Sequence, residues 1–366
     1  MARNTLPITK LASGRFQARY RDDTGRQRAK TFEHHGEAKK FLEQTRADMS
    51  RGTWIDPDDS SMTFREYSTR WLAAQSSAFG TRALIESNLR SHLLPVIGDV
   101  PLGRLRMSQL QALVTGLSTK SGNPLQRSTA QVVRQHLVQI LSAAVHDRMI
   151  LANPAKGVKV AAGGPVELVV PDPDEVQTIL ATIDDRSRGL VAVGAGLGLR
   201  QGEAFGLSGD RVDFLRRTVK IDRQLVRLQR GTGLGRLKTP RSYRTIPLPE
   251  SVGLELARHI ERYPSDDPDG LLFQAAQGGR IRRDGWNRRT WKPATAAAGR
   301  PDLGFHALRH FYASALIRSG LSAPAVARRL GNSPQMVLST YAHLWRDDDD
   351  RTREAIDGVL TWRSTG

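Results

Sequence analysis

The chain has 366 residues, of which 39% are hydrophobic and 25% charged, a composition typical of a globular protein with two or three domains. It carries 55 Lys and Arg against 37 Asp and Glu, a formal net charge of +18, which favours a polyanionic partner: nucleic acid or an anionic membrane surface. The absence of cysteine excludes disulfides, thiolate catalysis and Cys-ligated zinc. No apolar run approaches the roughly 20 residues that span a bilayer, and the first residues lack the apolar core of a signal peptide. A cytoplasmic protein is therefore expected, with no membrane partner.

The first region, residues 1–56, is predicted to be a small α+β domain. Residues 15–21 alternate between apolar and polar side chains, residues 26–32 are typical of the return strand of a hairpin, and residues 36–51 are predicted to form a helix. Seven basic and two acidic residues lie within residues 10–30, so the polar face of the sheet is expected to contact DNA. A solvated basic hairpin that binds nothing would give the same pattern. The candidate DNA-binding residues here are Arg15, Arg19, Arg21, Arg28 and Lys30.

The second region, residues 61–158, is predicted to be an all-helical bundle. Thr63 and Glu66 have the spacing of a capping box before the first helix. Further helices are expected from about residues 81 and 108, and over 128–148, where a long apolar stripe makes His136 a core residue rather than a metal ligand. Residues 159–171 contain Gly-Gly-Pro and no helical period, which indicates a linker.

The third region, residues 172–366, is predicted to be mainly helical with a small antiparallel sheet. Helices are expected at 173–183, 188–196, 200–207, 250–262, 284–297, 306–319, 322–330 and 334–343. Strands are expected at 211–215, 217–225 and 236–247. The last segment has an acidic run followed by a short amphipathic helix whose apolar side chains are Ala355, Ile356, Val359, Leu360 and Trp362.

Two histidines mark the helix predicted at 306–319. His306 and His310 have the i, i+4 spacing of a zinc-binding helix, but the residue after His306 is Ala rather than Glu, and the sequence offers no obvious third ligand. The alternative is phosphate chemistry. A histidine that titrates near neutrality beside the fixed positive charge of Arg309 is suited to acid–base work on a phosphate.

Three other segments carry candidate residues. The Gly-rich stretch 194–207 lacks both the GxGxxG pattern and a surrounding βαβ unit, so it is read as a turn from which Arg200 opens a helix with Glu203 as its partner. Lys238 lies near the turn of a basic hairpin at 217–249, where Arg241 and Arg244 are further candidate DNA contacts. Leu-Gly-Asn-Ser at 330–333 is followed by Tyr341.

Together these residues resemble the tyrosine recombinase (phage integrase) family. The resemblance rests on Arg200 in Gly-Leu-Arg-x-Gly-Glu, on Lys238, on the His306-x-x-Arg309-His310 motif and on Tyr341, in that order, with 35 residues from His306 to Tyr341. It identifies residues 172–366 as the catalytic domain and residues 61–158 as a core-site-binding domain. It also implies that residues 1–56 are an arm-type DNA-binding domain, with three strands and a helix.

The resemblance implies a mechanism. Tyr341 would attack a DNA phosphodiester to give a 3′-phosphotyrosine, Arg200 and Arg309 would bind the non-bridging oxygens, and Lys238 would protonate the leaving 5′-oxygen. His306 would assist proton transfer at Tyr341, supported by His310. No metal or other cofactor is expected. The implied partners are double-stranded DNA at phage and host attachment sites, a homotetramer on that DNA, an excisionase and a DNA-bending host factor, all at the nucleoid of a bacterial host.

One position departs from the family pattern. Asn332 stands where the family usually has His or Trp; its amide can donate a hydrogen bond to a phosphate oxygen but cannot be cationic. We therefore expect an active but slower site. Two other functions remain open: a DNA-binding protein that has lost catalysis, and a topoisomerase-like enzyme that nicks and closes DNA without a specific site.

Overall fold

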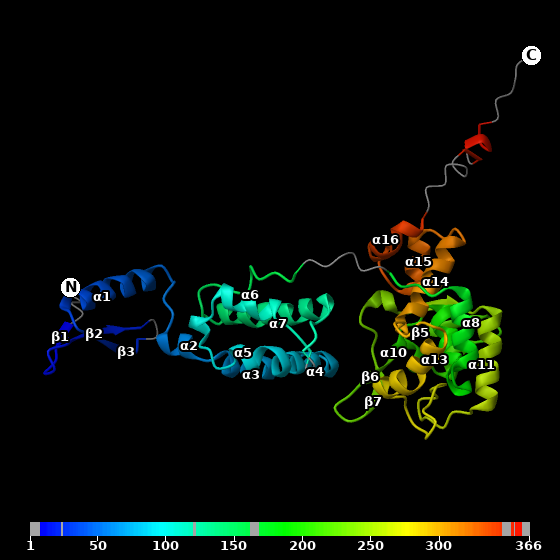
Figure 1. Cartoon of the computed structure of the whole chain (residues 1–366), viewed down its shortest axis with the longest axis horizontal. Coiled ribbons are helices and arrows are strands. Elements are labelled where there is room, and N and C mark those ends of the chain that lie inside the picture. Colours follow the sequence, from blue (N-terminus) through cyan, green and yellow to red (C-terminus); the bar gives the residue numbers. More distant parts are fainter. Residues whose placement is uncertain are drawn as a thin grey trace, which may run out of the picture. The chain divides into compact units, whose positions relative to one another are not determined.

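The computed structural model describes residues 8–22, 25–119, 122–161, 168–345, 353–354 and 356–360. The chain divides into two compact units, residues 1–164 and 165–366 (Figure 1). Within the described residues, no helix is both long and apolar enough to cross a membrane. Residues 162–167 of the predicted linker and the acidic run after Trp345 lie outside the described residues, as do Ala355 and Trp362 of the predicted terminal amphipathic helix.

The first unit begins with an antiparallel three-stranded sheet in the order β1-β2-β3. Its strands are β1 (Ile8–Lys10), β2 (Phe16–Arg21) and β3 (Gln27–Phe32), and α1 (His35–Ser50) packs on β2. The predicted alternation is confirmed, because Ala18 and Tyr20 are buried against Ala38 and Leu42 of α1 while Arg19 and Arg21 are exposed. The sheet therefore has one apolar face, covered by α1, and one basic face.

A helical bundle with a separate core follows in the same unit. Its elements are α2 (Pro57–Ser61), α3 (Phe64–Ala73), α4 (Phe79–Asn88), a π-helical stretch (Leu89–Leu93), α5 (Leu94–Ile97), α6 (Met107–Thr115) and α7 (Arg127–His146). The Thr63–Glu66 capping box is confirmed: each backbone N–H donates to the other's side chain. His136 is buried and bonded to Asn88, as expected of a core histidine. The last helix ends before the predicted residue 148, where Arg148 adopts a positive φ of 58°.

The second unit is mainly helical, as predicted. Its helices are α8 (Pro173–Thr182), α9 (Arg188–Leu197), α10 (Gln201–Phe205), α11 (Glu250–Arg262), α12 (Arg283–Trp286), α13 (Lys292–Ala297), α14 (His306–Arg318), α15 (Ala323–Leu330) and α16 (Pro334–Tyr341). A π-helical stretch, Asn287–Trp291, joins α12 to α13. Every helix expected in this region up to residue 343 is therefore present within a few residues of its predicted bounds.

The strand prediction for this unit is wrong in its topology. One long hairpin was expected, but the structure has two sheets: β4-β5-β8 and a separate hairpin β6-β7. The strands are β4 (Val212–Asp213), β5 (Thr218–Ile221), β6 (Gln224–Arg227), β7 (Thr232–Gly235) and β8 (Arg244–Pro247). The predicted strand 217–225 is interrupted at Asp222, which lies between β5 and β6 and whose carboxylate accepts hydrogen bonds from Arg211 and Arg223. β6 then turns away and packs on α10.

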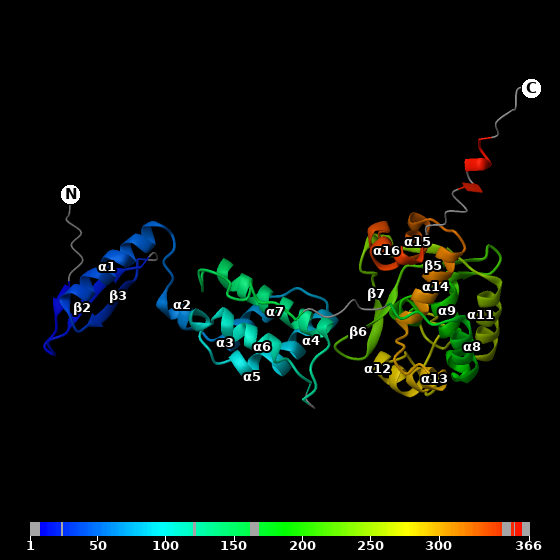
Figure 2. The same cartoon turned by 45° about the horizontal axis from the view of Figure 1, so that its top comes forward.

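Two hydrophobic cores lie along α14. The larger core surrounds α9 and includes Leu308. The smaller core joins α14 to α15 and α16 and contains Tyr312, Leu330, Val337 and Tyr341. Figure 2 shows α15 and α16 gathered at one end of α14. The C-terminal helices thus form a small packed layer of their own.

Candidate active site

Arg200 opens α10 immediately after a tight turn. α9 ends at Gly198, which adopts a left-handed φ of 64° that favours glycine. The Arg200 backbone N–H donates to Glu203 Oε2 (3.0 Å), and its Nη1 donates to Glu203 Oε1 (2.9 Å). Its Nη2 donates to Asn332 Oδ1 at 2.6 Å. The Arg200 side chain is 35% exposed, so the two side-chain bonds hold a guanidinium that still faces solvent.

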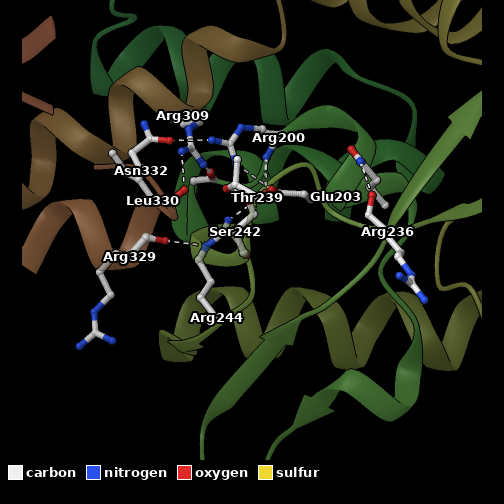
Figure 3. Close-up of polar contacts among 12 residues, drawn as sticks. Arg200, Glu203, Arg236, Thr239, Ser242, Arg244, Arg309, Arg329, Leu330 and Asn332 are labelled. Atoms are coloured by element: carbon white, nitrogen blue, oxygen red, sulfur yellow. Dashed lines mark hydrogen bonds and ion pairs between the residues drawn. The ribbon is translucent and has the colours of Figure 1, made fainter. Parts of the chain in front are cut away.

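The carboxylate of Glu203 is buried between two arginines (Figure 3). Arg244 Nη2 donates to it at 2.8 Å, and Arg244 also donates from Nε to the Arg329 carbonyl (2.8 Å) and from Nη1 to the Ser242 carbonyl (2.9 Å). Burial alone would raise the pKa of Glu203, but the hydrogen bond and charge of Arg244, then of Arg200, lower it below its ordinary value. Glu203 is therefore a fixed anion that orients Arg200.

Arg244 is placed differently from the prediction. It was expected to contact DNA, but its side chain is only 5% exposed, and its guanidinium is bonded to Ser242 just before β8, to Glu203 on α10 and to Arg329 near the end of α15. A side chain so enclosed cannot reach a DNA backbone. It acts instead as an internal brace, a role that the sequence did not indicate because its partners lie 41 and 85 residues away.

Arg309 is the largest fully buried side chain of the unit, with 2% of its surface exposed. Its Nη1 donates to the Gly198 carbonyl (2.7 Å) and its Nη2 to the Leu330 carbonyl (2.5 Å), which joins the ends of α9 and α15. Burial, followed by the charges of Arg200 and Arg244, lowers the pKa of Arg309 to about 9. In Figure 3 the Arg309 and Arg200 guanidinium groups lie next to each other, with Asn332 beside them. Two cations this close favour an anion between or above them.

Tyr341 ends α16, and its ring is 3% exposed. The His310 Nδ1 lies 2.7 Å from the Tyr341 hydroxyl oxygen, and the His306 ring contacts the His310 ring edge-on, with centroids 4.7 Å apart. His306 is exposed as a residue, but the protein around its ring desolvates the imidazolium. This desolvation, then the charges of His310, Arg309 and Arg200, lower the pKa of His306 to about 4. Burial raises the pKa of Tyr341 and, with Arg309, lowers that of His310. At neutral pH the pair is therefore an un-ionised phenol and a neutral imidazole, hydrogen bonded.

Lys238 lies outside this cluster of hydrogen bonds. It was expected near the turn of a hairpin, but the turn is at residues 228–231, and Lys238 follows β7 on the segment that leads to β8. Its side chain is exposed, and it lines a shallow open hollow of about 480 Å³ with Leu237, Thr239, Pro240 and Tyr243. Arg241, three residues on, is also exposed. A flexible cation at an open edge can approach a bound phosphate without being fixed in advance.

The candidate DNA-binding residues of the first unit are placed unequally. Arg15, Arg19, Arg21 and Lys30 are exposed. Arg28 is not free: it forms ion pairs with Asp22 (3.1 Å), Asp56 and Asp58, and its side chain is 16% exposed. The sequence did not reveal this because two of the three carboxylates lie 28 and 30 residues away. Arg28 thus ties the sheet to the start of α2, and its guanidinium is less available to DNA than those of the exposed arginines.

One further network was missed. The buried amide of Gln201, next to Arg200, accepts from Arg283 Nε (2.7 Å) and donates to Asn287 Oδ1 (2.6 Å). The charge of Arg283 also acts on His306, so a third cation borders the site. No group of three or more His, Asp or Glu in the described part of the chain could hold a metal ion. The cluster brings the charges of Arg200, Arg283 and Arg309 to bear on His306, and Arg309 also acts on Tyr341.

Comparisons with known proteins agree with this geometry. Residues 170–347 match the model described as "Phage integrase family", and residues 7–51 match "Phage integrase, N-terminal domain". The integrase of Mycobacterium phage L5 is 25% identical over 358 residues, covering 94% of this chain and 95% of the relative. A putative prophage phiRv2 integrase of Mycobacterium tuberculosis (strain CDC 1551 / Oshkosh) is 26% identical over 350 residues, covering 93% and 92%.

Two solved structures share the fold. A Tn1549 transposon integrase in complex with a circular intermediate DNA superposes with a TM-score of 0.68 at 22% identity, covering 82% of this chain and 100% of that one. A lambda integrase dimer bound to a COC′ core site gives 0.58 at 17% identity, covering 100% and 99%. The chain belongs to the phage integrase family of tyrosine-type site-specific recombinases. The integrases of phages L5 and D29 are among its full-length relatives.

Proposed function

We propose that the protein cleaves and rejoins DNA at phage and host attachment sites through a 3′-phosphotyrosine on Tyr341, and so integrates and excises phage DNA. The observation that carries this proposal is the convergence of Arg200 with Arg309 and the His310–Tyr341 pair, which lie more than 100 residues further along the chain, around one end of α14. A phosphodiester needs cations for its non-bridging oxygens, a nucleophile and a proton acceptor. This cluster supplies all three.

The proposed roles follow the chemistry of each group. Arg200, held by Glu203 and Asn332, and Arg309 bind the non-bridging oxygens and stabilise the charge that develops in the transition state. Lys238 approaches from its open segment and protonates the leaving 5′-oxygen. His306 is exposed beside both arginines, and a bound phosphate would raise its pKa because an anion favours the imidazolium. It then donates a hydrogen bond to a phosphate oxygen.

Tyr341 must become accessible before it reacts. Its ring is buried in the small core that joins α14, α15 and α16, so a phosphate can reach the hydroxyl only if α16 shifts. We propose that DNA binding drives a shift that keeps the His310–Tyr341 hydrogen bond, and that the binding energy offsets the lost contacts of the small core. Cleavage is thereby confined to protein already seated on DNA.

The other regions are proposed as DNA-binding modules. Residues 61–158 bind the core site. Residues 1–56 bind a second, arm-type site through Arg15, Arg19, Arg21 and Lys30. Residues 159–171 link the bundle to the catalytic domain, residues 172–366. Because the two modules are on one chain, binding of one module raises the effective concentration of the other at a nearby second site. By analogy with the lambda integrase tetramer bound to a Holliday junction, we propose a homotetramer on DNA at the bacterial nucleoid. An excisionase and a DNA-bending host factor are further proposed partners.

The test is a covalent trap. Purified protein is mixed with attachment-site DNA nicked near the crossover, so that the released fragment diffuses away, and a denaturation-resistant protein–DNA adduct is measured with EDTA present. Wild-type protein should form the adduct and Tyr341→Phe should not. Tight binding without an adduct would favour a catalytically silent DNA-binding protein. Relaxation of any supercoiled plasmid, without a cognate site, would favour a topoisomerase-like enzyme.

A further inference from the structure

His310 has an unexpected position relative to the nucleophile. Among the described residues, its Nδ1 is the hydrogen-bond partner of the Tyr341 hydroxyl, at 2.7 Å, whereas no hydrogen bond joins His306 to Tyr341. Both members of the pair are largely shielded from water. A proton acceptor within hydrogen-bond distance of the proton it removes meets the first geometric requirement of a general base.

The protonation states fit the same assignment. The charged and titratable groups that face the pair are Arg309, whose charge disfavours an imidazolium, and His306, whose ring lies edge-on to that of His310. Burial and Arg309 lower the pKa of His310, so the ring is neutral near pH 7 and its Nδ1 can accept. Burial raises the pKa of the Tyr341 phenol, which makes it a poor nucleophile until its proton is removed.

We propose that His310, rather than His306, takes the phenolic proton of Tyr341 during attack; this rests on the proposed function. As the Tyr341 oxygen bonds to phosphorus, its O–H bond breaks and the proton moves to His310 Nδ1. The bond from phosphorus to the 5′-oxygen breaks, and that oxygen takes a separate proton from Lys238. In the rejoining step the His310 imidazolium returns its proton to the departing phenol. His306 is left to bind the phosphate.

The position of His310 on α14 supports a division of work between the two histidines. Arg309 and His310 are adjacent on the helix and point in different directions. Arg309 donates to the carbonyls of Gly198 and Leu330, while His310 faces Tyr341 of α16. His306, one turn earlier, lies beside Arg200 and Arg283. His306 and His310 therefore lie one turn apart on the same face of α14, with His306 toward the arginines and His310 toward Tyr341.

The experiment separates proton uptake from hydrogen bonding. His310→Asn keeps a side-chain acceptor for the Tyr341 hydroxyl but cannot take up a proton, and His310→Ala keeps neither. If His310 is the base, both variants should form adduct at least ~100-fold more slowly than wild type, the lower end of the effect of a general base. Adduct formation by His310→Asn near the wild-type rate would overturn the proposal, because His310 would then only position Tyr341. Thermal unfolding and DNA binding of each variant confirm that it is folded.

A second measurement tests the assignment through the nucleophile itself. Site-specific fluorotyrosine at position 341 lowers the pKa of the phenol and so lessens its need for a base. It should restore adduct formation in His310→Asn but not in the matched control His306→Gln, whose defect is phosphate binding. Equal recovery in both variants, or recovery only in His306→Gln, would overturn the assignment. Absence of adduct in the wild type would instead reject the proposed function, and the proposal with it.

Discussion

Replacing Arg244 with leucine tests whether the brace on Glu203 stabilises the catalytic domain. The change removes two bonds to Glu203 and leaves the carbonyls of Arg329 and Ser242 without this donor. Glu203 is 2% exposed and keeps Arg200 as its remaining cation. Removal of one partner from a buried ion pair costs ~3–5 kcal/mol, and this is the loss expected in the free energy of unfolding at neutral pH.

The assay is urea unfolding of wild type, Arg244→Leu, Glu203→Leu and the double variant. The double variant should lose less than the sum of the singles, because it leaves no unpaired buried carboxylate. The pKa of Glu203 is lowered in the folded wild type, so its ionised form stabilises the protein above the unfolded pKa, and this contribution is lost as the pH falls through the folded pKa. Without Arg244, burial raises the Glu203 pKa, so the variant's deficit should shrink at acid pH. A deficit below ~1 kcal/mol, or one that grows on acidification, would refute the reasoning.

Three other changes give distinct outcomes. Gly198→Ala should destabilise the domain and slow cleavage, because Gly198 has a positive φ and a Cβ there would overlap the Tyr312 ring. Thermal unfolding and the rate of adduct formation measure the two effects, and wild-type values for both would contradict the prediction. Asn332→Ala removes the side-chain acceptor of Arg200 Nη2. The loss of a hydrogen bond to a charged group should slow cleavage roughly tenfold or more. Asn332→His should speed cleavage if asparagine handicaps the site, and an unchanged or lower rate would reject that handicap. In the first unit, Arg21→Ala should lower the slope of log affinity for the arm site against log salt concentration by about one. Arg28→Ala should chiefly lower the free energy of unfolding of this unit. Equal slopes for the two variants would contradict this distinction.

The helices could be predicted because their signals are local. Capping pairs such as Thr63–Glu66 and apolar stripes of helical period lie within a few residues of each other, and these elements match their expected bounds. The sheets of the second unit could not be placed. The alternation of residues 217–225 gives no sign of the interruption at Asp222, where the side chain binds Arg211 from a segment outside that strand.

The site residues divide in the same way. The motif around His306 and Arg309 is local on one helix and was identified from the sequence. The bonds that define each residue's surroundings are not local: Arg200 meets Asn332 across 132 residues, and Arg309 meets Gly198 across 111. Arg28 and Arg244 show the result, since a basic residue in a basic segment looks the same whether it faces solvent or a buried carboxylate.

The small core of α14, α15 and α16 has a consequence for how the protein responds to heat. It holds Tyr341 and lies apart from the larger core around α9, and separate cores can melt in separate steps. Warming should therefore loosen the last two helices before the rest of the catalytic domain, once the bonds from Arg309 and Arg244 to the end of α15 are lost. A sample would then lose DNA cleavage at a temperature below the main calorimetric transition and regain it on cooling. The apolar side chains of the small core would determine that temperature.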